Sequence, residues 1–412
     1  MSDSAPPNES KGSKSDTPRT GICLAYTAYQ QEICEHLNEV NLSGESMGGF
    51  SVLNPSPEEK AMAWVIQQNS KSAVSLEKST QRFALATLFF HNKVQSEPDL
   101  FCKDLRQHWT LDAIESTQNE CDWFGDTVEC SDDGAVTRLR LGWDTQDGLD
   151  LVSDFDSLRC FTGTLPSNLA LLSNLRVISM NGQDFLETTI PESFYNLTSL
   201  ELLSMGSSSI GGTISPALDK LTNLKVLDLS RNLLRGEIPT SLGPLSNMQE
   251  FRLDHNLLSG TIPSPVVSFG TVKKVLLHEN KLTGSIPNAI GQMVNLERLE
   301  LQGNALTGGI PAGLGNLRSL TTVHAFNNGL ADDENPLCSS NQNYDSLSLD
   351  CDQVHCPCCT NCCQATNVGA SMCTTTICQI CHSSLPVECF EIENIDDSWR
   401  ERALSCSCAC SR

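Results

Sequence analysis

Apolar residues recur with a fixed period through the middle of the chain, from about residue 136 to residue 337. An aliphatic residue followed by proline marks each period, at spacings of 25 and then 24 residues, and Ser215 takes the proline slot once. Counted from that slot, positions −1, +3, +6, +9, +12 and +14 are apolar in all seven periods. One such unit cannot bury its apolar face alone, so the pattern predicts a solenoid whose stacked coils share one core. The marking prolines are Pro166, Pro191, Pro239, Pro263, Pro287 and Pro311.

Within each coil, the spacing predicts two kinds of local structure. Apolar residues at +12 and +14 with a mostly polar residue between them are typical of a short strand with one buried face. The +3, +6 and +9 positions predict a loose helical or 3₁₀ segment on the opposite side. At +17 an asparagine is expected to hydrogen-bond the backbone at the turn, and Gln183 and Ser208 are expected to break this ladder in the first two coils. The asparagines are Asn232, Asn256, Asn280, Asn304 and Asn328.

The segments on either side of the repeat are expected to close its ends. Ser56, Pro57 and Glu59 provide an N-cap, a first-turn proline and a capping box, which predict a helix to about residue 69 and another over 79–90. At the other end, a Cys338–Cys351 disulfide would close the last coil. The sequence predicts four regions. Residues 1–55 are expected to be disordered or poorly defined, and residues 56–135 to form a helical cap. Residues 136–337 are expected to form about seven 24-residue coils, and residues 338–412 a cap and cysteine-rich tail.

The charge balance excludes some classes of partner. Acidic residues outnumber basic ones 50 to 27, giving a net charge of −23, so the chain repels nucleic acid and anionic lipid. The sequence has no run of about 18 apolar residues that could span a bilayer, and its first residues do not form a signal peptide. We therefore expect membrane attachment only through an anchor that is not in this sequence.

The cysteines favour an oxidising environment. Of twenty in all, six lie between Cys23 and Cys160 and fourteen between Cys338 and Cys410. Closely spaced cysteines in such numbers are typical of disulfides in exported proteins, so we expect an extracellular or cell-surface location, with an upstream export or anchoring segment absent from this sequence. Thiolate coordination of zinc or copper(I) by residues 356–363 is the alternative.

Residues 224–239 resemble the plant-type leucine-rich repeat, with Gly236 and the following Ile238-Pro239 as its diagnostic end. The resemblance covers about residues 136–337. It implies an α/β leucine-rich repeat solenoid, a horseshoe or right-handed superhelix with short parallel strands on its concave side, and it implies receptor-like ectodomains as relatives.

Residues 121–125 and Cys130 resemble the disulfide-bonded amino-terminal cap of the same family, which implies a Cys121–Cys130 bridge. An extra residue before Val128 and the identity of Asp126 depart from the family pattern. Residues 81–90 and 356–363 further resemble leucine-rich repeat proteins expanded in diatoms, in which an anchored extracellular repeat domain is usual.

Signatures of catalysis are weak. Residues 44–48 match the nucleophile-elbow pattern of hydrolases but lie in a polar, turn-rich stretch, and residues 378–382 match a c-type haem attachment site within a segment dense in cysteine. The glycine-rich loop, His-Arg-Asp loop and Asp-Phe-Gly motif of protein kinases are missing from the sequence. We therefore expect neither an enzyme nor a cofactor.

The remaining candidate site is the concave face, where residues beside the two buried strand positions project outward. Exposed Leu276 and Phe326 among charges favour a binding surface. Because His255, His278 and His324 lie in different columns of different coils, we expect no metal site among them. The candidate ligand-binding residues are Asp228, Ser230, Arg231, Arg252, Asp254, His255, Leu276, His278, Glu279, Glu300, Gln302, His324 and Phe326.

The sequence thus predicts a non-catalytic recognition module that binds a protein, peptide or glycan, as a receptor-like ectodomain in cell-surface signalling or defence. The alternative is a structural or cell-wall-associated protein assembled through its repeats and cysteine tail. If the chain is exported, Asn196 is the expected glycosylation site, in the sequon Asn196-Leu197-Thr198.

Overall fold

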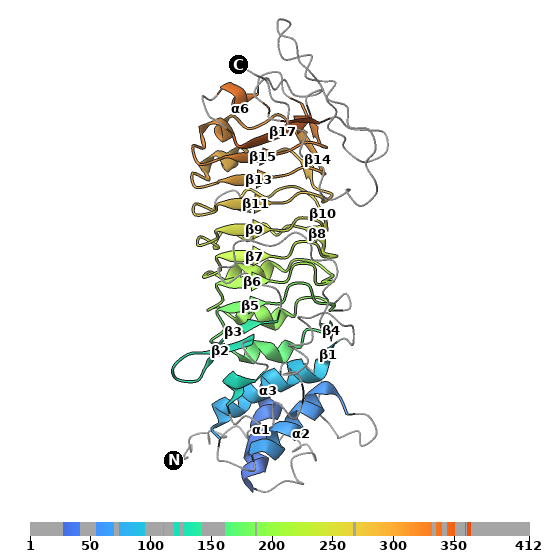
Figure 1. Cartoon of the computed structure of the whole chain (residues 1–412), viewed down its shortest axis with the longest axis vertical. Helices are drawn as coiled ribbons and strands as arrows, with labels where there is room; N and C mark the ends of the chain where they lie inside the picture. The colour runs from blue at the N-terminus through green and yellow to red at the C-terminus, as the bar shows by residue number, and fades with distance from the viewer. Residues whose placement is uncertain are drawn as a thin grey trace, which may run out of the picture.

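The computed structural model describes residues 28–41, 55–69, 74–94, 110, 119–123, 127–141, 161–185, 188–266, 269–331, 335–339, 344–350, 359 and 361–363. They form a long stack of coils with helices α1, α2 and α3 at its amino-terminal end (Figure 1). Three features singled out in the sequence lie outside the described residues: the elbow-like residues 44–48, the haem-like residues 378–382, and Cys351.

One sheet of eleven strands runs the length of the stack. Its order is β18-β17-β15-β13-β11-β9-β7-β6-β5-β3-β2, and all neighbours are parallel except β2 and β3. One strand per coil in sequence order is what the repeat predicts. The strands are β2 (Val128–Cys130), β3 (Val136–Arg140), β5 (Val177–Ser179), β6 (Leu202–Ser204), β7 (Val226–Asp228), β9 (Glu250–Arg252), β11 (Lys274–Leu276), β13 (Arg298–Glu300), β15 (Thr322–His324), β17 (Ser346–Asp350) and β18 (Asn361–Cys363).

The core follows the predicted columns. Leu227 of β7 lies opposite Leu203 of β6 and Phe251 of β9, and all three side chains are fully buried. The coils turn back through the +3 to +9 positions, and in the part of the chain that the structure describes five of them form the predicted 3₁₀ segment. These segments are η4 (Ser167–Leu171), η5 (Glu192–Asn196), η6 (Pro216–Lys220), η8 (Asn288–Gln292) and η9 (Ala312–Asn316).

The asparagine ladder is present and extends further than predicted. Asn232 donates to the carbonyls of Met205, Leu229 and Ser230. The expectation that Gln183 and Ser208 break the ladder is wrong. The Gln183 amide donates to two backbone carbonyls and accepts from Phe161 N, and the Ser208 hydroxyl donates to two more. Both side chains therefore satisfy buried backbone groups as asparagine does elsewhere.

A second row of strands was not foreseen. It contains β8 (Arg235–Glu237), β10 (Leu257–Ser259), β12 (Thr283–Gly284), β14 (Ala305–Gly308) and β16 (Gly329–Leu330), paired as β8–β10 and β12–β14–β16. Gly236 shows why this row needs glycine: its φ is +81°, and an added Cβ would lie 3.1 Å from the Thr213 methyl group of the preceding coil. The family's diagnostic glycine is thus required by the backbone turn and by close packing between coils.

The amino-terminal helices are α1 (Ala28–Val40), α2 (Pro57–Asn69) and α3 (Leu76–His91). The predicted capping box starts α2, since Glu59 N–H donates to the Ser56 hydroxyl and Ser56 N–H donates to the Glu59 carboxylate. Helix α1 corrects the expectation for residues 1–55. Ile33 and Leu37, one turn apart on one face, are fully buried, and packing of that face stabilises the helix.

This helical cap joins the first coil through polar and aromatic contacts. Gln81 of α3 accepts from Val136 N of β3 at 2.7 Å, and β1 (Asn92–Val94) pairs antiparallel with β4 (Phe161–Gly163). Buried Arg82 contacts Glu120 of η2 (Glu120–Asp122) at 3.2 Å, and the ring of Trp123 meets that of Trp64 edge to face at 5.1 Å. The cap therefore covers apolar surface that an open solenoid end would expose to water.

The predicted Cys121–Cys130 disulfide is present in this cap, with the two Cα atoms 5.8 Å apart. It ties the η2 turn to β2, the first strand of the long sheet. Trp123 lies inside the closed loop and is 2% exposed, as expected of a ring that covers the first coil. Phe124, expected to do the same, lies outside the described residues.

Replacing Cys121 and Cys130 together by alanine should lower the free energy of unfolding by about 2.5–3 kcal/mol, because the bridge restricts the unfolded chain. Chemical denaturation of both proteins would measure the difference. Asp132→Ala, an exposed change in the turn that follows β2, should stay within about 0.5 kcal/mol of the wild type. A double variant as stable as the wild type would contradict the prediction.

At the other end the sheet extends past residue 337, where the coils were predicted to stop. Helix α6 (Pro336–Ser339) is followed by β17 and β18, and the Asp350 carboxylate accepts from the backbone N–H groups of Asn327 and Asn328. Cys34, Cys338 and Cys359 are disulfide-bonded, so Cys359 is not a thiolate metal ligand. Among the described residues, no helix is both long enough and apolar enough to cross a bilayer.

Candidate functional site

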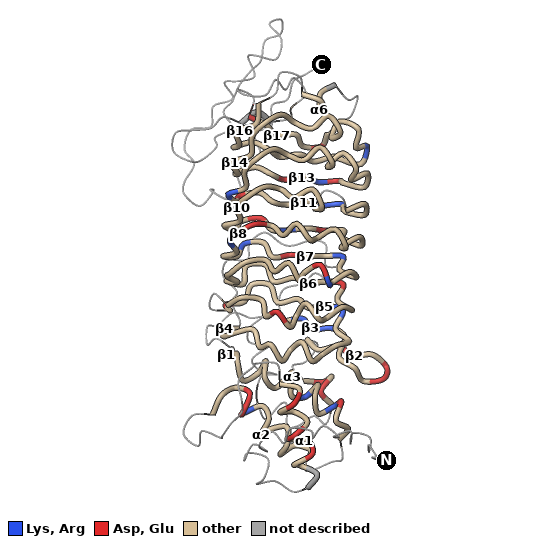
Figure 2. Tube along the Cα trace, turned by 180° about the vertical axis from the view of Figure 1, so that it is seen from behind, with Lys and Arg blue, Asp and Glu red and all other residues tan. Residues whose placement is uncertain are grey.

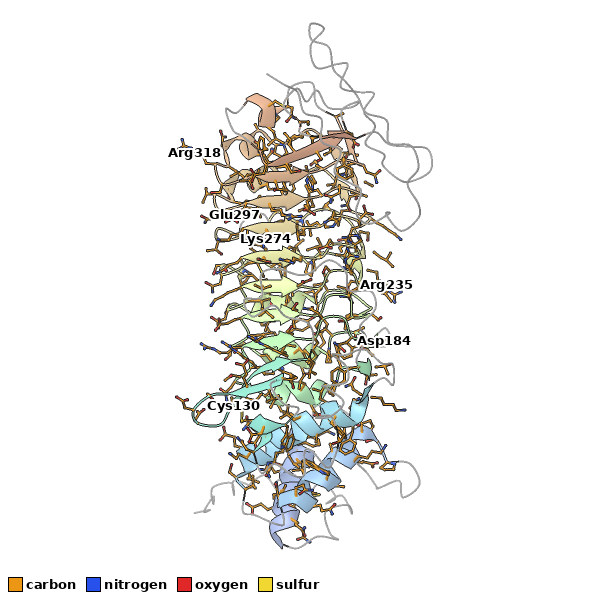
Figure 3. All side chains as sticks on the ribbon, viewed as in Figure 1. Cys130, Asp184, Arg235, Lys274, Glu297 and Arg318 are labelled. Atoms are coloured by element: carbon orange, nitrogen blue, oxygen red, sulfur yellow. A yellow bond between two sulfur atoms is a disulfide. The ribbon has the colours of Figure 1, made fainter. Side chains whose placement is uncertain are left out.

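The outward side chains of β7, β9, β11, β13 and β15, with those of the two to four residues that follow each strand, form a polar surface. We call this surface the strand face. Lys274 of β11 lies on it, whereas Arg235 of β8 lies at the far edge of the coils (Figure 3). Seen from behind, acidic and basic residues are interspersed along the stack (Figure 2), so the negative net charge is not gathered in one block there.

The strand face carries all thirteen predicted residues but does not expose them equally. Arg231 and Glu279 are exposed, and His255, Leu276, His278, Gln302 and His324 are half-buried. The expectation that the rest project into solvent is wrong, because strands about 4.8 Å apart bring side chains of one column into contact and each covers the next. The buried residues, 2–8% exposed, are Asp228, Ser230, Arg252, Asp254, Glu300 and Phe326.

Ion pairs account for much of this burial. Arg252 pairs with Glu250, and Lys274 Nζ lies 3.1 Å from the other Glu250 oxygen. Arg298 pairs with Glu300.

Three of these residues were not predicted from the sequence, namely Glu250, Lys274 and Arg298. The sequence does contain a pattern that could have identified them. Each stands one position before the first buried residue of its strand, so its side chain points outward, as does that of the residue that follows the buried one. Charge reversal at Arg252 or Glu300 would break these pairs and destabilise the fold.

Glu300 connects the histidines of neighbouring coils. Its carboxylate lies 3.2 Å from His278 Nδ1 and 3.7 Å from His324 Nδ1, and it accepts from the Gln302 amide. Burial lowers the pKa of His278 despite the opposing charges of Asp254 and Glu300. Burial likewise lowers the pKa of His324, against the charge of Glu300. Burial therefore favours the neutral form of both rings.

Asp254, His255 and His278 come together where β9 and β11 end, although His255 and His278 lie in different columns of different coils. Asp254 Oδ2 lies 3.1 Å from His255 Nδ1 and 3.7 Å from His278 Nε2. The two rings stand 4.9 Å apart at 83°. Burial opposes ionisation of Asp254, but the His255 hydrogen bond and both histidines together outweigh it and lower its pKa. The contact between these side chains arises because they are diagonal neighbours in adjacent coils. Side chains from different columns still touch across the spacing between two neighbouring strands.

The residue that follows each strand by three positions has a left-handed backbone. Arg231, His255 and Glu279 have φ of 53°, 51° and 52°, which is rare for residues other than glycine. Each donates its N–H to a carbonyl of the next coil, at 2.8–3.0 Å. These inter-coil hydrogen bonds hold the chain in that conformation and fix the direction in which each side chain leaves the edge of the strand face.

Asp228 is one of the most deeply buried carboxyl groups of the strand face, at 2% exposed. Its Oδ1 accepts from the N–H and hydroxyl of Ser230 at 3.0 and 2.6 Å. Burial raises the pKa of Asp228 above its ordinary value of 3.8, although Ser230 and the charge of Arg252 oppose the rise.

Ionisation of Asp228 should destabilise the protein, because its folded pKa lies above its unfolded pKa. The neutral acid therefore stabilises the fold at low pH, and that contribution is lost as pH rises from the unfolded pKa through the folded one. Asp228→Asn should raise the melting temperature at pH 7 and flatten its decline above pH 4. Melting curves from pH 4 to 8 would measure this, with exposed Asp345→Asn as the control. A variant that is less stable at pH 7 would contradict the prediction.

Comparison with known proteins agrees with the repeat. A sequence model described as Leucine Rich Repeat matches residues 223–245 and 295–317. Receptor like protein 26 of Arabidopsis thaliana is 37% identical over 90 residues, which is 21% of this chain. Phytosulfokine receptor 1 of the same plant is 30% identical over 104 residues, or 25% of this chain. Each match spans 9% of the relative's own length.

Among solved structures, that of PEPR1-AtPEP1 matches with a TM-score of 0.50 and 28% identity, over 60% of this chain and 31% of that one. The 24-residue coils and the parallel strand in each coil agree with these matches. The chain folds as a leucine-rich repeat solenoid and is similar to plant receptor-like proteins that carry such repeats.

Proposed function

We propose that this chain is a non-catalytic recognition module that binds a protein, peptide or glycan on its strand face, the side predicted to be concave, in cell-surface signalling or defence. The observation that carries the proposal is a continuous sheet whose outward face presents charged side chains of both signs. The resemblance of this chain to a phytosulfokine receptor and to the structure of PEPR1-AtPEP1 supports a peptide or protein ligand.

The accessible part of the strand face is narrower than the predicted set. Arg231 and Glu279 are exposed, the Arg298 side chain is 49% exposed and that of His255 36%. They come from coils next to one another, over β7 to β13, so they would contact one partner together. The buried ion pairs beneath them hold the face in shape.

The disulfide between Cys121 and Cys130, with the bonded Cys34, Cys338 and Cys359, supports an oxidising compartment. We therefore propose an extracellular or cell-surface location. Asn196 is exposed at the end of η5, so its side chain is accessible for the predicted glycosylation.

The test is binding of the purified full chain to arrays of synthetic peptides and of glycans, followed by affinity measurement for each hit. The double variant Arg231→Glu, Glu279→Lys should weaken binding at least about tenfold, as loss of central charged contacts does. The control double variant Arg235→Glu, Lys281→Glu changes exposed residues away from the strand face and should bind normally.

Both variants should melt like the wild type, because the changed side chains are exposed. If the two double variants lost binding affinity equally, the result would contradict a binding site on the strand face. Arrays without any hit would favour the structural or wall-associated alternative.

A further inference from the structure

We propose that Asp254, His255 and His278 form a binding site for a divalent transition-metal cation of the zinc class. Among the residues that the structure describes, they are the one group of three or more potential ligands that lie within 4.8 Å of one another. The inference concerns the cation alone and does not depend on the proposed binding of a partner.

The separations between ligand atoms suit such a cation. In a tetrahedral site with ligands about 2.0–2.2 Å from zinc, neighbouring ligand atoms stand roughly 3.3–3.6 Å apart. The Asp254 oxygen lies 3.1 Å from His255 Nδ1 and 3.7 Å from His278 Nε2, on either side of that range. The nitrogens of the two histidines lie within 4.8 Å of each other, so the imidazole rings would rotate toward one another to place all three atoms around one ion.

The surrounding residues hold the ligands in place. His278 Nδ1 faces the Glu300 carboxylate at 3.2 Å, which leaves Nε2 directed toward Asp254. A carboxylate behind a ligating histidine supports many metal sites by fixing the ring orientation; His278 Nδ1 makes no hydrogen bond yet, and a small turn of the ring toward Glu300 would form one. The backbone N–H of His255 donates to the His278 carbonyl at 3.0 Å, so the two coils that supply the ligands are also joined at this point.

The exposure of the group leaves one side open. The Asp254 and His278 side chains are 9% and 13% exposed, whereas that of His255 is 36% exposed. A cation could therefore enter from the strand face, and its fourth position would be taken by water. Two imidazole nitrogens and one carboxylate favour zinc or its neighbours over calcium and magnesium, which prefer oxygen ligands.

The test uses the full chain, stripped with EDTA, under non-reducing conditions that keep its disulfides intact. Titration with zinc chloride in a calorimeter should show one site per chain. His255→Gln and His278→Gln should each weaken zinc binding at least about tenfold, which is the scale seen even for supporting residues of metal sites. His324→Gln, which removes a histidine of the same face that also contacts Glu300, should leave the affinity unchanged.

Two further measurements locate the bound cation. Zinc should raise the melting temperature of the wild type and of His324→Gln but not of the two ligand variants. With cobalt in place of zinc, the visible spectrum should show nitrogen and oxygen ligands only. Thiolate absorption, unchanged zinc affinity in both ligand variants, or no binding at millimolar zinc would overturn the proposal.

Discussion

Leu227→Ala is expected to lower the free energy of unfolding by about 2–5 kcal/mol, the range found when a fully buried leucine is truncated. Leu227 is 0% exposed and lies between Leu203 and Phe251 of the adjoining strands. Neither neighbour can fill the space that the missing atoms leave, because each is held in register by its own strand. The loss therefore combines lost burial with a persistent cavity.

Denaturant unfolding of the wild type and variant would measure this loss. Leu233→Ala makes the same chemical change in the turn that follows the same strand, at a side chain that is 41% exposed, and should shift stability by no more than about 0.5 kcal/mol. If both variants unfolded at the same denaturant concentration, the assignment of buried columns would be wrong.

Asn232→Ala is expected to destabilise the protein by about 2–6 kcal/mol, because the side chain satisfies buried backbone groups. The Asn232 side-chain carbonyl accepts from Ser208 N and Ile210 N, at 3.0 and 2.9 Å. Truncation would leave both N–H groups buried without a partner, at about 1–3 kcal/mol each. The backbone carbonyls that accept hydrogen bonds from the Asn232 side-chain amide lose a donor as well. The expected loss of stability therefore lies above the lower limit of this range.

The control is Asn223→Ala in the same coil. The Asn223 amide also donates to a backbone carbonyl, that of Thr198, but at an exposed position where water can replace it. Chemical denaturation should show a change of less than about 1 kcal/mol for this control. Similar losses for the two variants would show that the ladder stabilises the fold no more than a surface contact does.

The period of the sequence predicts most of the fold, because it reports which side chains must be buried together. The columns that contain Leu227 and the 3₁₀ segments were placed correctly from the period, whereas the Cys121–Cys130 bridge was implied by the family resemblance and is present. The second row of strands was not, since residues such as Arg235 and Glu237 of β8 show no burial pattern. The second row of strands is defined only by backbone hydrogen bonds between adjacent coils.

The candidate site was harder to predict than the core. Asp254 and His278 belong to different coils, and neither periodicity nor composition reports how closely diagonal neighbours approach. The burial of Glu300 has the same origin, because its cover comes from His278 and His324 in the coils on either side. Sequence patterns identify the direction of a side chain along one strand, whereas the environment of a site depends on the strands beside it.

The left-handed residues at the edge of the strand face have a consequence for association with a partner. Arg231, His255 and Glu279 leave the backbone from positions that inter-coil hydrogen bonds already fix. A partner docking there would lose little entropy to ordering the main chain, so preorganisation would favour its affinity. Tight recognition by a few side chains then becomes compatible with a small contact area.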